Sequence, residues 1–470
     1  MLRTQQELIT ALLQQVKQLD ALRVQLAELE VLRSKVAELE ARLNKNSQNS
    51  HKPPSSDGFK KPRRKPAFPR KKNKKRGGQP GHKGRTLEMS AQVDDTIIHR
   101  PEKCTCGHTL SGSKGQLVEK RQVFDLPEPR LEVIEHQVHS CTCSQCGKVS
   151  VGEFPVAVPA RVQYGSGVRA LSTLLNNGLN MPYGKVRRLF CDLFGYELNE
   201  STQTSAQQRC YEHLEAEEAR IKTALLNSMT NHYDESGIRI DCKLHWLHAC
   251  TNEQYTYLFV HPKRGRQALD SKASLLPHFR NWAIHDRWAS YFLYDNCRHA
   301  DCGAHLLRDL QGLIDQGSQW AQQMHELLLM AYQKSDYGKS VATNPKTIDK
   351  KYDKICRLAQ KEEPPPVQRF KGKRPKRTKG RNLLEHLEKY KDTVLAFAMH
   401  EAVPFTNNQA ERDIRPVKVK QKVSGCFRTQ KGAQQYARIQ GFISTARKQQ
   451  LNVFNELLAI FQGKKSSFAF

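Results

Sequence analysis

The chain has 470 residues, which is too long for a single hydrophobic core, so several domains are expected. Its 76 lysines and arginines outnumber its 47 acidic residues, which gives a formal net charge of +29. This excess favours a polyanion as the partner, above all a nucleic acid, over the alternatives of a soluble protein with basic tails and a membrane-surface binder.

The positive charge is concentrated in two stretches. Residues 60–85 carry thirteen lysines and arginines and no acid, and residues 369–381 carry eight and no acid. The sequence has no signal peptide and no apolar run long enough to span a bilayer, so we expect a cytoplasmic protein without a membrane partner. In a reducing compartment the thirteen cysteines are not expected to form disulfides, and closely spaced ones are expected to bind metal.

Residues 1–45 are expected to form a coiled coil. Apolar residues recur at steps of three and four with one irregularity, and no Gly or Pro interrupts the series Leu19, Leu22, Leu26, Leu29, Leu32, Val36, Leu39 and Leu43. A single helix packed on the rest of the protein is the alternative. We favour a homo-oligomer joined through this seam, because no neighbouring apolar segment is available to cover it.

Residues 46–100 are expected to be a linker rich in Pro, Gly and basic residues. Its cations suit contact with DNA phosphates without reading of bases, and a solubilising tail is the alternative. The residues assigned to this contact are Lys71, Lys72, Lys74, Lys75, Arg76 and Lys83.

Residues 101–155 contain two cysteine clusters, each followed by a glycine, which is typical of a zinc ribbon. Thiolates bind Zn²⁺ tetrahedrally, and four of them leave no open position, so the pattern predicts a structural rather than a catalytic zinc. The expected ligands are Cys104, Cys106, Cys143 and Cys146.

The ligand set has alternatives, because the first cysteine pair is one residue shorter than C-x-x-C. Cys141 or His108 could replace one of its members. Between the clusters, apolar and polar residues alternate over Gln122–Leu126 and Leu131–Val138, which predicts short strands.

Residues 156–230 are expected to be helical. Apolar residues have helical spacing over 167–177 and 185–194, and Asn199 can cap a long helix that reaches toward Met229. A DNA-reading helix-turn-helix and a bundle that joins two domains both fit this pattern.

The period changes to two after residue 231, which predicts strands over Tyr233–Ile240, Leu244–Cys250, Tyr255–Val260 and Trp282–Asp286. Asp234 and Asp286 lie at strand ends, where both carboxylates can project at one edge of a sheet. Asp295 and Asp301 compete with Asp286 for this role.

A third acid, Glu411, lies on an expected helix that Thr406 or Asn407 can cap and that Pro416 ends or kinks. Three carboxylates from separate elements of a basic chain can hold two divalent metal ions against a phosphodiester and drive an in-line displacement. Basic residues on the same helix could hold the DNA phosphates, with surface salt bridges as the alternative: Arg412, Arg415, Lys418 and Lys420.

Several motifs resemble those of insertion-sequence-66 family transposases and occur in that family's order. They are Lys75-Arg76-Gly77-Gly78-Gln79-Pro80-Gly81-His82-Lys83-Gly84, Asp234-Glu235-Ser236-Gly237, the Cys302-x-x-His305 stretch and Asn407-Asn408-Gln409-Ala410-Glu411-Arg412. The resemblance runs from about the linker to the C-terminus. The first cysteine pair departs from it, because the family usually has C-x-x-C there.

The resemblance implies a DDE centre made of Asp234, Asp286 and Glu411, with Mg²⁺ or Mn²⁺ as the cofactor. The expected fold is multidomain α+β: coiled coil, zinc ribbon, helical DNA-binding region, and an RNase H-like α/β catalytic core. That core would comprise residues 231–302 and 401–470, with a helical insertion at 303–400.

The implied enzyme is a bacterial, nucleoid-associated transposase. It would bind the terminal inverted repeats of an insertion sequence, hydrolyse phosphodiester bonds there and transfer the 3′ ends to target DNA, with accessory proteins of the same element as further partners. A plain nuclease is one alternative. The other is a non-catalytic, zinc-containing DNA-binding protein or repressor derived from a transposase.

We expect Cys302 and His305, with Cys297 and His299 nearby, to be buried structural residues rather than a second metal site.

Overall fold

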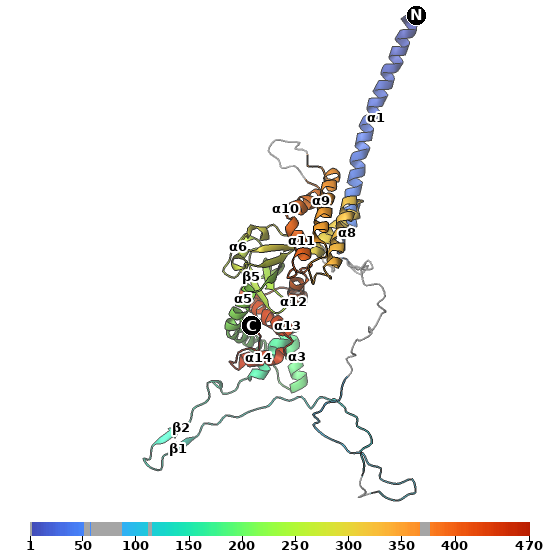
Figure 1. Ribbon diagram of the computed structural model, residues 1–470. Helices are drawn as coiled ribbons and strands as arrows, with labels where there is room; N and C mark the ends of the chain where they lie inside the picture. Colours follow the sequence, from blue (N-terminus) through green and yellow to red (C-terminus); the bar gives the residue numbers. More distant parts are fainter. Residues whose placement is uncertain (1, 51–56, 58–86, 111–114, 367–376) are drawn as a thin grey trace. The chain divides into compact units, whose positions relative to one another are not determined.

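The computed structural model describes residues 2–50, 57, 87–110, 115–366 and 377–470 (Figure 1). The chain divides into two compact units, one of residues 1–68, 160–187 and 198–470 and a smaller one of residues 69–159 and 188–197. No helix in the described ranges is both long and apolar enough to cross a bilayer. The linker residues assigned to phosphate contact lie outside the described residues: Lys71, Lys72, Lys74, Lys75, Arg76 and Lys83.

The smaller unit contains an antiparallel pair of short strands, β1 (Ser140–Thr142) and β2 (Val149–Val151). The strands expected over residues 122–126 and 131–138 are absent from this described stretch, so that prediction is wrong. Alternation produces a strand only where a neighbouring surface covers the apolar side chains. Here those side chains are exposed: Val123, Leu126, Val133 and Ile134.

The N-terminal residues form one continuous helix, α1 (Leu2–Leu43). All eight apolar residues of the expected coiled-coil seam are exposed on it. The helix itself matches the sequence pattern, and its association with a second copy stays a prediction.

Four helical segments precede the main sheet. They are α2 (Ser166–Thr173), which continues into a π-helical turn at Leu174–Gly178, then α3 (Tyr183–Phe194), α4 (Glu200–His213) and α5 (Glu215–Leu226). The single long helix expected after Asn199 is therefore divided. Leu214 lies between α4 and α5 at φ −81° and ψ −1°, and its side chain is buried in the core.

A five-stranded mixed sheet forms the centre of the larger unit (Figure 1). Its strands are β3 (Thr230–Ile240), β4 (Lys243–Thr251), β5 (Thr256–His261), β6 (Trp282–His285) and β7 (Arg298–Asp301). They lie in the order β5-β4-β3-β6-β7. The first three pair antiparallel, whereas β6 and β7 run parallel to β3. The four strands predicted from alternation are confirmed, and β7 was not foreseen.

Helices make up most of the rest of this unit. The short α6 (Arg266–Leu269) follows β5. After β7 come α7 (Gly303–Ile314), α8 (Gln319–Lys334), α9 (Pro345–Glu362), α10 (Lys379–Lys389), α11 (Lys391–Met399), α12 (Asn408–Ser424), α13 (Gln430–Lys448) and α14 (Val453–Phe461). Helices α7 to α11 lie within residues 303–400, where a helical insertion is expected.

Side chains of successive strand residues point to opposite faces of the sheet, so each face carries apolar residues. Helices cover both faces. On one face Ile238, Leu247 and Leu258 pack with Ile414 and Val417 of α12. On the other, aromatic residues of β3 and β5 pack with α5, α13 and α14 in a second cluster. Helix α13 approaches β5 so closely that a Cβ at Gly441 would lie 3.0 Å from the Thr256 carbonyl oxygen.

Candidate active site

Asp234 lies on the sheet face that α12 covers. Along β3 it shares its face with Ile238, which packs against α12. In the parallel pairing of β3 with β6, His232 is opposite Ile284. Asp234 and Asp286 each lie two residues beyond that pair, so the register brings the two acids to neighbouring positions on the same face.

Asp234 is buried and lies near other carboxylates. Burial raises the pKa of Asp234 well above its usual value, and the carboxylates of Glu235, Asp286 and Glu411 raise it further. The backbone N–H of Glu235 donates to Asp234 Oδ1 at 2.9 Å and opposes this shift. Acids from β3, the end of β6 and α12 therefore repel one another, and a bound cation would relieve that repulsion.

Asp286 directly follows β6, and its side chain is oriented by a hydrogen bond to the backbone two residues later. Its Oδ1 accepts a hydrogen bond from the Trp288 N–H at 3.1 Å. Arg287 between them has φ +71°, a left-handed conformation that is costly for a side chain of this size. The Arg287 guanidinium pairs with Asp309 of α7, which helps to fix this turn.

Glu411 lies in the first turn of α12 and faces two residues of α7. Its Oε1 is 3.6 Å from Arg308 Nη2 and 3.9 Å from His305 Nε2. His305 and Arg308 are three residues apart, so they share one face of α7. The expected buried role of Cys302 is confirmed, because its sulfur accepts a hydrogen bond from the Asn407 N–H at 3.1 Å.

The Asn407 side chain forms hydrogen bonds with β3. It does not cap α12, contrary to one of the two caps expected from the sequence. Its Nδ2 donates to the Tyr233 carbonyl at 2.7 Å, and its Oδ1 accepts from His232 Nδ1 at 2.9 Å. Burial lowers the pKa of His232 to about 4, which keeps the ring neutral. The start of α12 is thus bonded to the residue that precedes Asp234. The helix then continues through Pro416 to Ser424 rather than ending at the proline.

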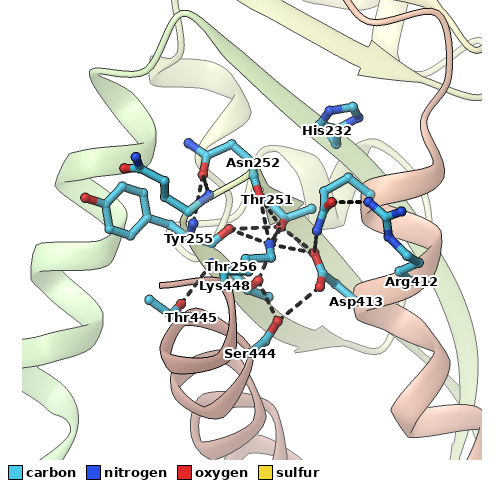
Figure 2. A network of polar contacts seen from close by, with 12 residues as sticks. His232, Thr251, Asn252, Tyr255, Thr256, Arg412, Asp413, Ser444, Thr445 and Lys448 are labelled. Atoms are coloured by element: carbon cyan, nitrogen blue, oxygen red, sulfur yellow. Dashed lines mark hydrogen bonds and ion pairs between the residues drawn. The ribbon is translucent and has the colours of Figure 1, made fainter. Parts of the chain in front are cut away.

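A buried polar network holds the opposite side of α12 (Figure 2). Lys448 of α13 donates to Asp413 Oδ2 at 2.8 Å and to the carbonyls of Asn252 and Tyr255 at 2.7 and 3.0 Å. Asp413 also accepts from Thr251 at 2.6 Å and from Ser444 at 3.0 Å. Because Asp413 is two residues after Glu411, this network and the acid cluster lie on different sides of the same helix.

The sequence analysis missed Glu235 and its partners as parts of this site. The Glu235 side chain is fully buried, and its Oε1 is 2.6 Å from both Nε and Nη2 of Arg264. Its Oε2 accepts from the Tyr291 hydroxyl. The position of Glu235 directly after Asp234 was the only sequence signal for it. Arg264 lies in the loop before α6 and Tyr291 begins a short 3₁₀ helix, Tyr291–Leu293, so only the fold brings them to Glu235.

The two competing acids lie elsewhere. Asp301 ends β7, where it is buried and accepts from His386 Nε2 at 2.6 Å. Asp295 lies in the turn before β7. Within the described ranges, no three His, Cys, Asp or Glu side chains stand close enough to enclose a metal ion, either here or at the cysteines.

The basic residues assigned to α12 lie along its surface. Arg412, Arg415 and Lys418 are exposed, and Lys418 Nζ donates to the Gly237 carbonyl at 2.7 Å. Lys418 is also close enough to Asp234 for the two charges to interact. Lys420 lies 5.7 Å from the centre of the Tyr183 ring.

In the smaller unit each cysteine cluster forms a tight turn that closes on its glycine, over three residues in the first cluster and four in the second. The Gly107 N–H donates to the Cys104 carbonyl, and the Gly147 N–H to the Cys143 carbonyl, both at 2.9 Å. Each glycine has a positive φ, +89° and +71°. Hydrogen bonds from nearby groups, first the Cys106 and Cys146 backbones, lower the pKa of the Cys104 and Cys143 thiols.

Residues 161–435, more than half of the chain, match the family described as Transposase IS66. The chain belongs to the IS66 transposase family. The matched range of this DDE transposase family includes Asp234, Asp286 and Glu411. Residues 101–147, which hold both cysteine clusters, match the zinc-finger binding domain of IS66 transposases. Residues 3–88 match a family of unknown function, DUF6444. No curated protein is significantly similar to this IS66 chain.

Proposed function

We propose that this IS66 family chain binds the ends of an insertion sequence, cleaves phosphodiester bonds there and joins the freed 3′ ends to target DNA. The observation that carries the proposal is the meeting of three acids from separate elements at Asp234. The strand order, with three antiparallel strands followed by two parallel ones, supports an RNase H-like core.

The donor chemistry of this site fits divalent metal ions. Carboxylate oxygens are the ligands that Mg²⁺ and Mn²⁺ prefer. Burial first, and then the neighbouring carboxylates, raise the pKa of Asp234, and a bound cation would favour its ionised form. Asp234, Asp286 and Glu411 would hold the ions. When bound, these ions would activate the attacking oxygen and stabilise the leaving oxygen of the phosphodiester.

The other residues of the site would orient these acids and the DNA. Asn407 fixes the start of α12 against β3, and Arg308 lies beside Glu411. The exposed Arg412, Arg415 and Lys418 would bind backbone phosphates near the acids, because guanidinium and ammonium groups form charge-assisted hydrogen bonds with phosphate. Lys420 and the linker lysines would extend this contact.

The remaining parts would serve assembly and binding. The four thiols Cys104, Cys106, Cys143 and Cys146 would hold a structural Zn²⁺, with Cys141 or His108 as the alternative fourth ligand. Helix α1 would join copies of the chain through its seam. Target DNA, the element's terminal repeats and accessory proteins of the same element would be the partners, in the bacterial cytoplasm.

Cleavage of labelled DNA carrying the ends of the element that encodes this chain tests the proposal. We expect the wild type to nick at the ends with Mg²⁺ or Mn²⁺. Asp234→Asn, Asp286→Asn and Glu411→Gln should each lose about a thousandfold or more in rate while DNA affinity changes little. Asp295→Asn, which lies outside the acid cluster, is the matched control and should cleave normally.

The same assay separates the alternatives. Cleavage without joining of 3′ ends to a second DNA would indicate a plain nuclease. Binding by the wild type without cleavage under either metal, even with cell extract added, would support the non-catalytic DNA-binding protein instead.

A further inference from the structure

Arg264 lies beside the acid cluster in a fixed orientation, in the loop between β5 and α6. Its guanidinium places Nε and Nη2 2.6 Å from the same Glu235 oxygen. Glu235 is a firm anchor, because its side chain is fully buried and its other oxygen is bonded by the Tyr291 hydroxyl.

Two indole rings hold the same guanidinium. Its carbon lies 4.3 Å from the centre of the Trp288 ring and 5.1 Å from that of Trp246. Stacking on aromatic faces and bonding to a buried acid restrict a side chain that would otherwise be mobile. About a third of the Arg264 side chain nevertheless stays exposed, at 36%.

The part of the guanidinium that does not contact Glu235 is chemically suited to an anion. A guanidinium carries five N–H donors in a planar fork. Glu235 uses the edge formed by Nε and Nη2, which leaves the end formed by Nη1 and the second hydrogen of Nη2. Nη2 lies 3.9 Å from Asp286 Oδ2, so that end is next to a member of the acid cluster.

Nearby Arg266 shows how different this arrangement is from an ordinary surface pair. Its side chain is 74% exposed and contacts Asp270, which is itself 48% exposed. Such a pair contributes little to stability and leaves the arginine free to move. Arg264, in contrast, is held by buried and aromatic partners, while about a third of its side chain stays exposed and its Nη2 lies close to Asp286.

We propose that Arg264 binds a phosphate of the DNA strand at the acid cluster, through the guanidinium edge that Glu235 leaves free. A planar fork can bind a carboxylate on one edge and a phosphate on another, which an ammonium cannot do in the same geometry. This contact offsets the repulsion between the phosphate and the acids and sets the position of the strand against Asp286. The inference rests on the proposed function, since it requires DNA at this site.

The test pairs changes in the protein with changes in the DNA. End-bearing DNA is synthesised with a single neutral methylphosphonate, placed in turn at each phosphate near the cleaved bond, and its affinity is measured with Ca²⁺ replacing Mg²⁺. For wild type and for Arg266→Gln, one position should weaken binding about tenfold or more, the size of one charge-assisted hydrogen bond. For Arg264→Gln, a methylphosphonate at that same position should lower DNA affinity little further.

Two further variants keep the test decisive if Arg264→Gln folds poorly because it leaves Glu235 buried and unpaired. Glu235→Gln/Arg264→Gln removes both charges, and Arg264→Lys keeps the positive charge but not the fork. Both should lose the coupling to the methylphosphonate. If a methylphosphonate lowers DNA affinity equally in wild type and variants at every position, Arg264 does not bind a phosphate of the DNA. Absence of wild-type cleavage with Mg²⁺ would count against the proposed transposase activity instead, whatever the coupling shows.

Discussion

At the scale of single residues, the acid cluster is held in place by neutral hydrogen bonds. Asn407 is buried and joins the start of α12 to the Tyr233 carbonyl and to the neutral ring of His232. A negatively charged residue in this place would add to the field that already disfavours ionised Asp234. The amide avoids that and still fixes the distance between β3 and the helix of Glu411.

Asn407→Ala should lower stability and, more strongly, cleavage. It leaves the His232 N–H and the Tyr233 carbonyl without partners, which costs about 1–3 kcal/mol for each buried group left unpaired. Urea unfolding and the rate of end cleavage under saturating DNA measure the two effects. Asn408→Ala, at the exposed next position, is the control and should change neither. An Asn407→Ala protein that cleaves at the wild-type rate would show that cleavage does not require the hydrogen bonds between Asn407 and β3.

Local signals in the sequence made Asp234, Asp286 and Glu411 candidates, and the family resemblance favoured Asp286 over Asp295 and Asp301. Asp234 and Asp286 sit in alternating strands, and Glu411 follows residues suited to begin a helix. Asn407 was predicted as a cap, yet its amide bonds across to β3. Glu235 and Arg264 are 29 positions apart and meet only in the folded chain, so no local pattern reveals them.

At the scale of elements, the Asp413–Lys448 network fixes how α12 and α13 sit on the turn between β4 and β5 (Figure 2). Both charged side chains are almost fully buried, with exposures of 8% and 9%. Such a pair stabilises a fold little compared with apolar residues, but breaking it leaves a buried charge unpaired. The network is therefore better suited to fixing the rotation of α12 than to adding stability.

Lys448 gives this network a pH dependence. Burial lowers its pKa from 10.5 to about 8. Between these values the unfolded chain binds a proton that the folded chain has lost, so this group increases stability as pH rises. From about pH 7.5 to about pH 9.5, the free energy of unfolding of the wild type should rise relative to Lys448→Met by roughly 1–2 kcal/mol.

Urea unfolding of both proteins at the two pH values measures how the stability difference between them changes with pH, in which titrating groups that do not interact with Lys448 cancel. Lys448→Gln, which is also uncharged, should behave like Lys448→Met. A wild type that becomes less stable than either variant as pH rises would contradict the buried position of the ammonium group.

The elements of the larger unit were more predictable than those of the smaller one. Alternation located β3 to β6, because neighbouring strands and helices cover their apolar faces. The same alternation failed over residues 122–138, where the apolar side chains have no such cover. The sequence pattern also gave no warning that the helix is divided at Leu214.

At the scale of the whole molecule, the smaller unit has few contacts of its own, and metal would supply the folding energy that its short strands lack. We predict one bound Zn²⁺ per chain. Cys143→Ser should lose it, whereas Cys141→Ser should keep it if the ligands are Cys104, Cys106, Cys143 and Cys146. Metal analysis of the purified variants decides this, and the opposite result would make Cys141 a ligand.

Helix α1 should join copies of the chain. Its exposed seam would bury apolar surface only against another helix. Leu26→Glu places a charge in that seam and should lower the molecular mass in solution, measured by light scattering during gel filtration. Gln14→Glu adds the same charge off the seam and should leave the mass unchanged. A monomeric wild type would rule out the seam as the joining surface.

The central claim is that Asp234 and Glu411, on different elements, act as one metal-dependent centre. The rate of end cleavage by Asp234→Asn, by Glu411→Gln and by the double variant tests it most directly. Residues that act as a unit lose their function together, so each single variant should lose about a thousandfold or more and the double variant hardly more. Losses that multiply in the double variant, or near-normal cleavage by either single variant, would contradict a shared centre.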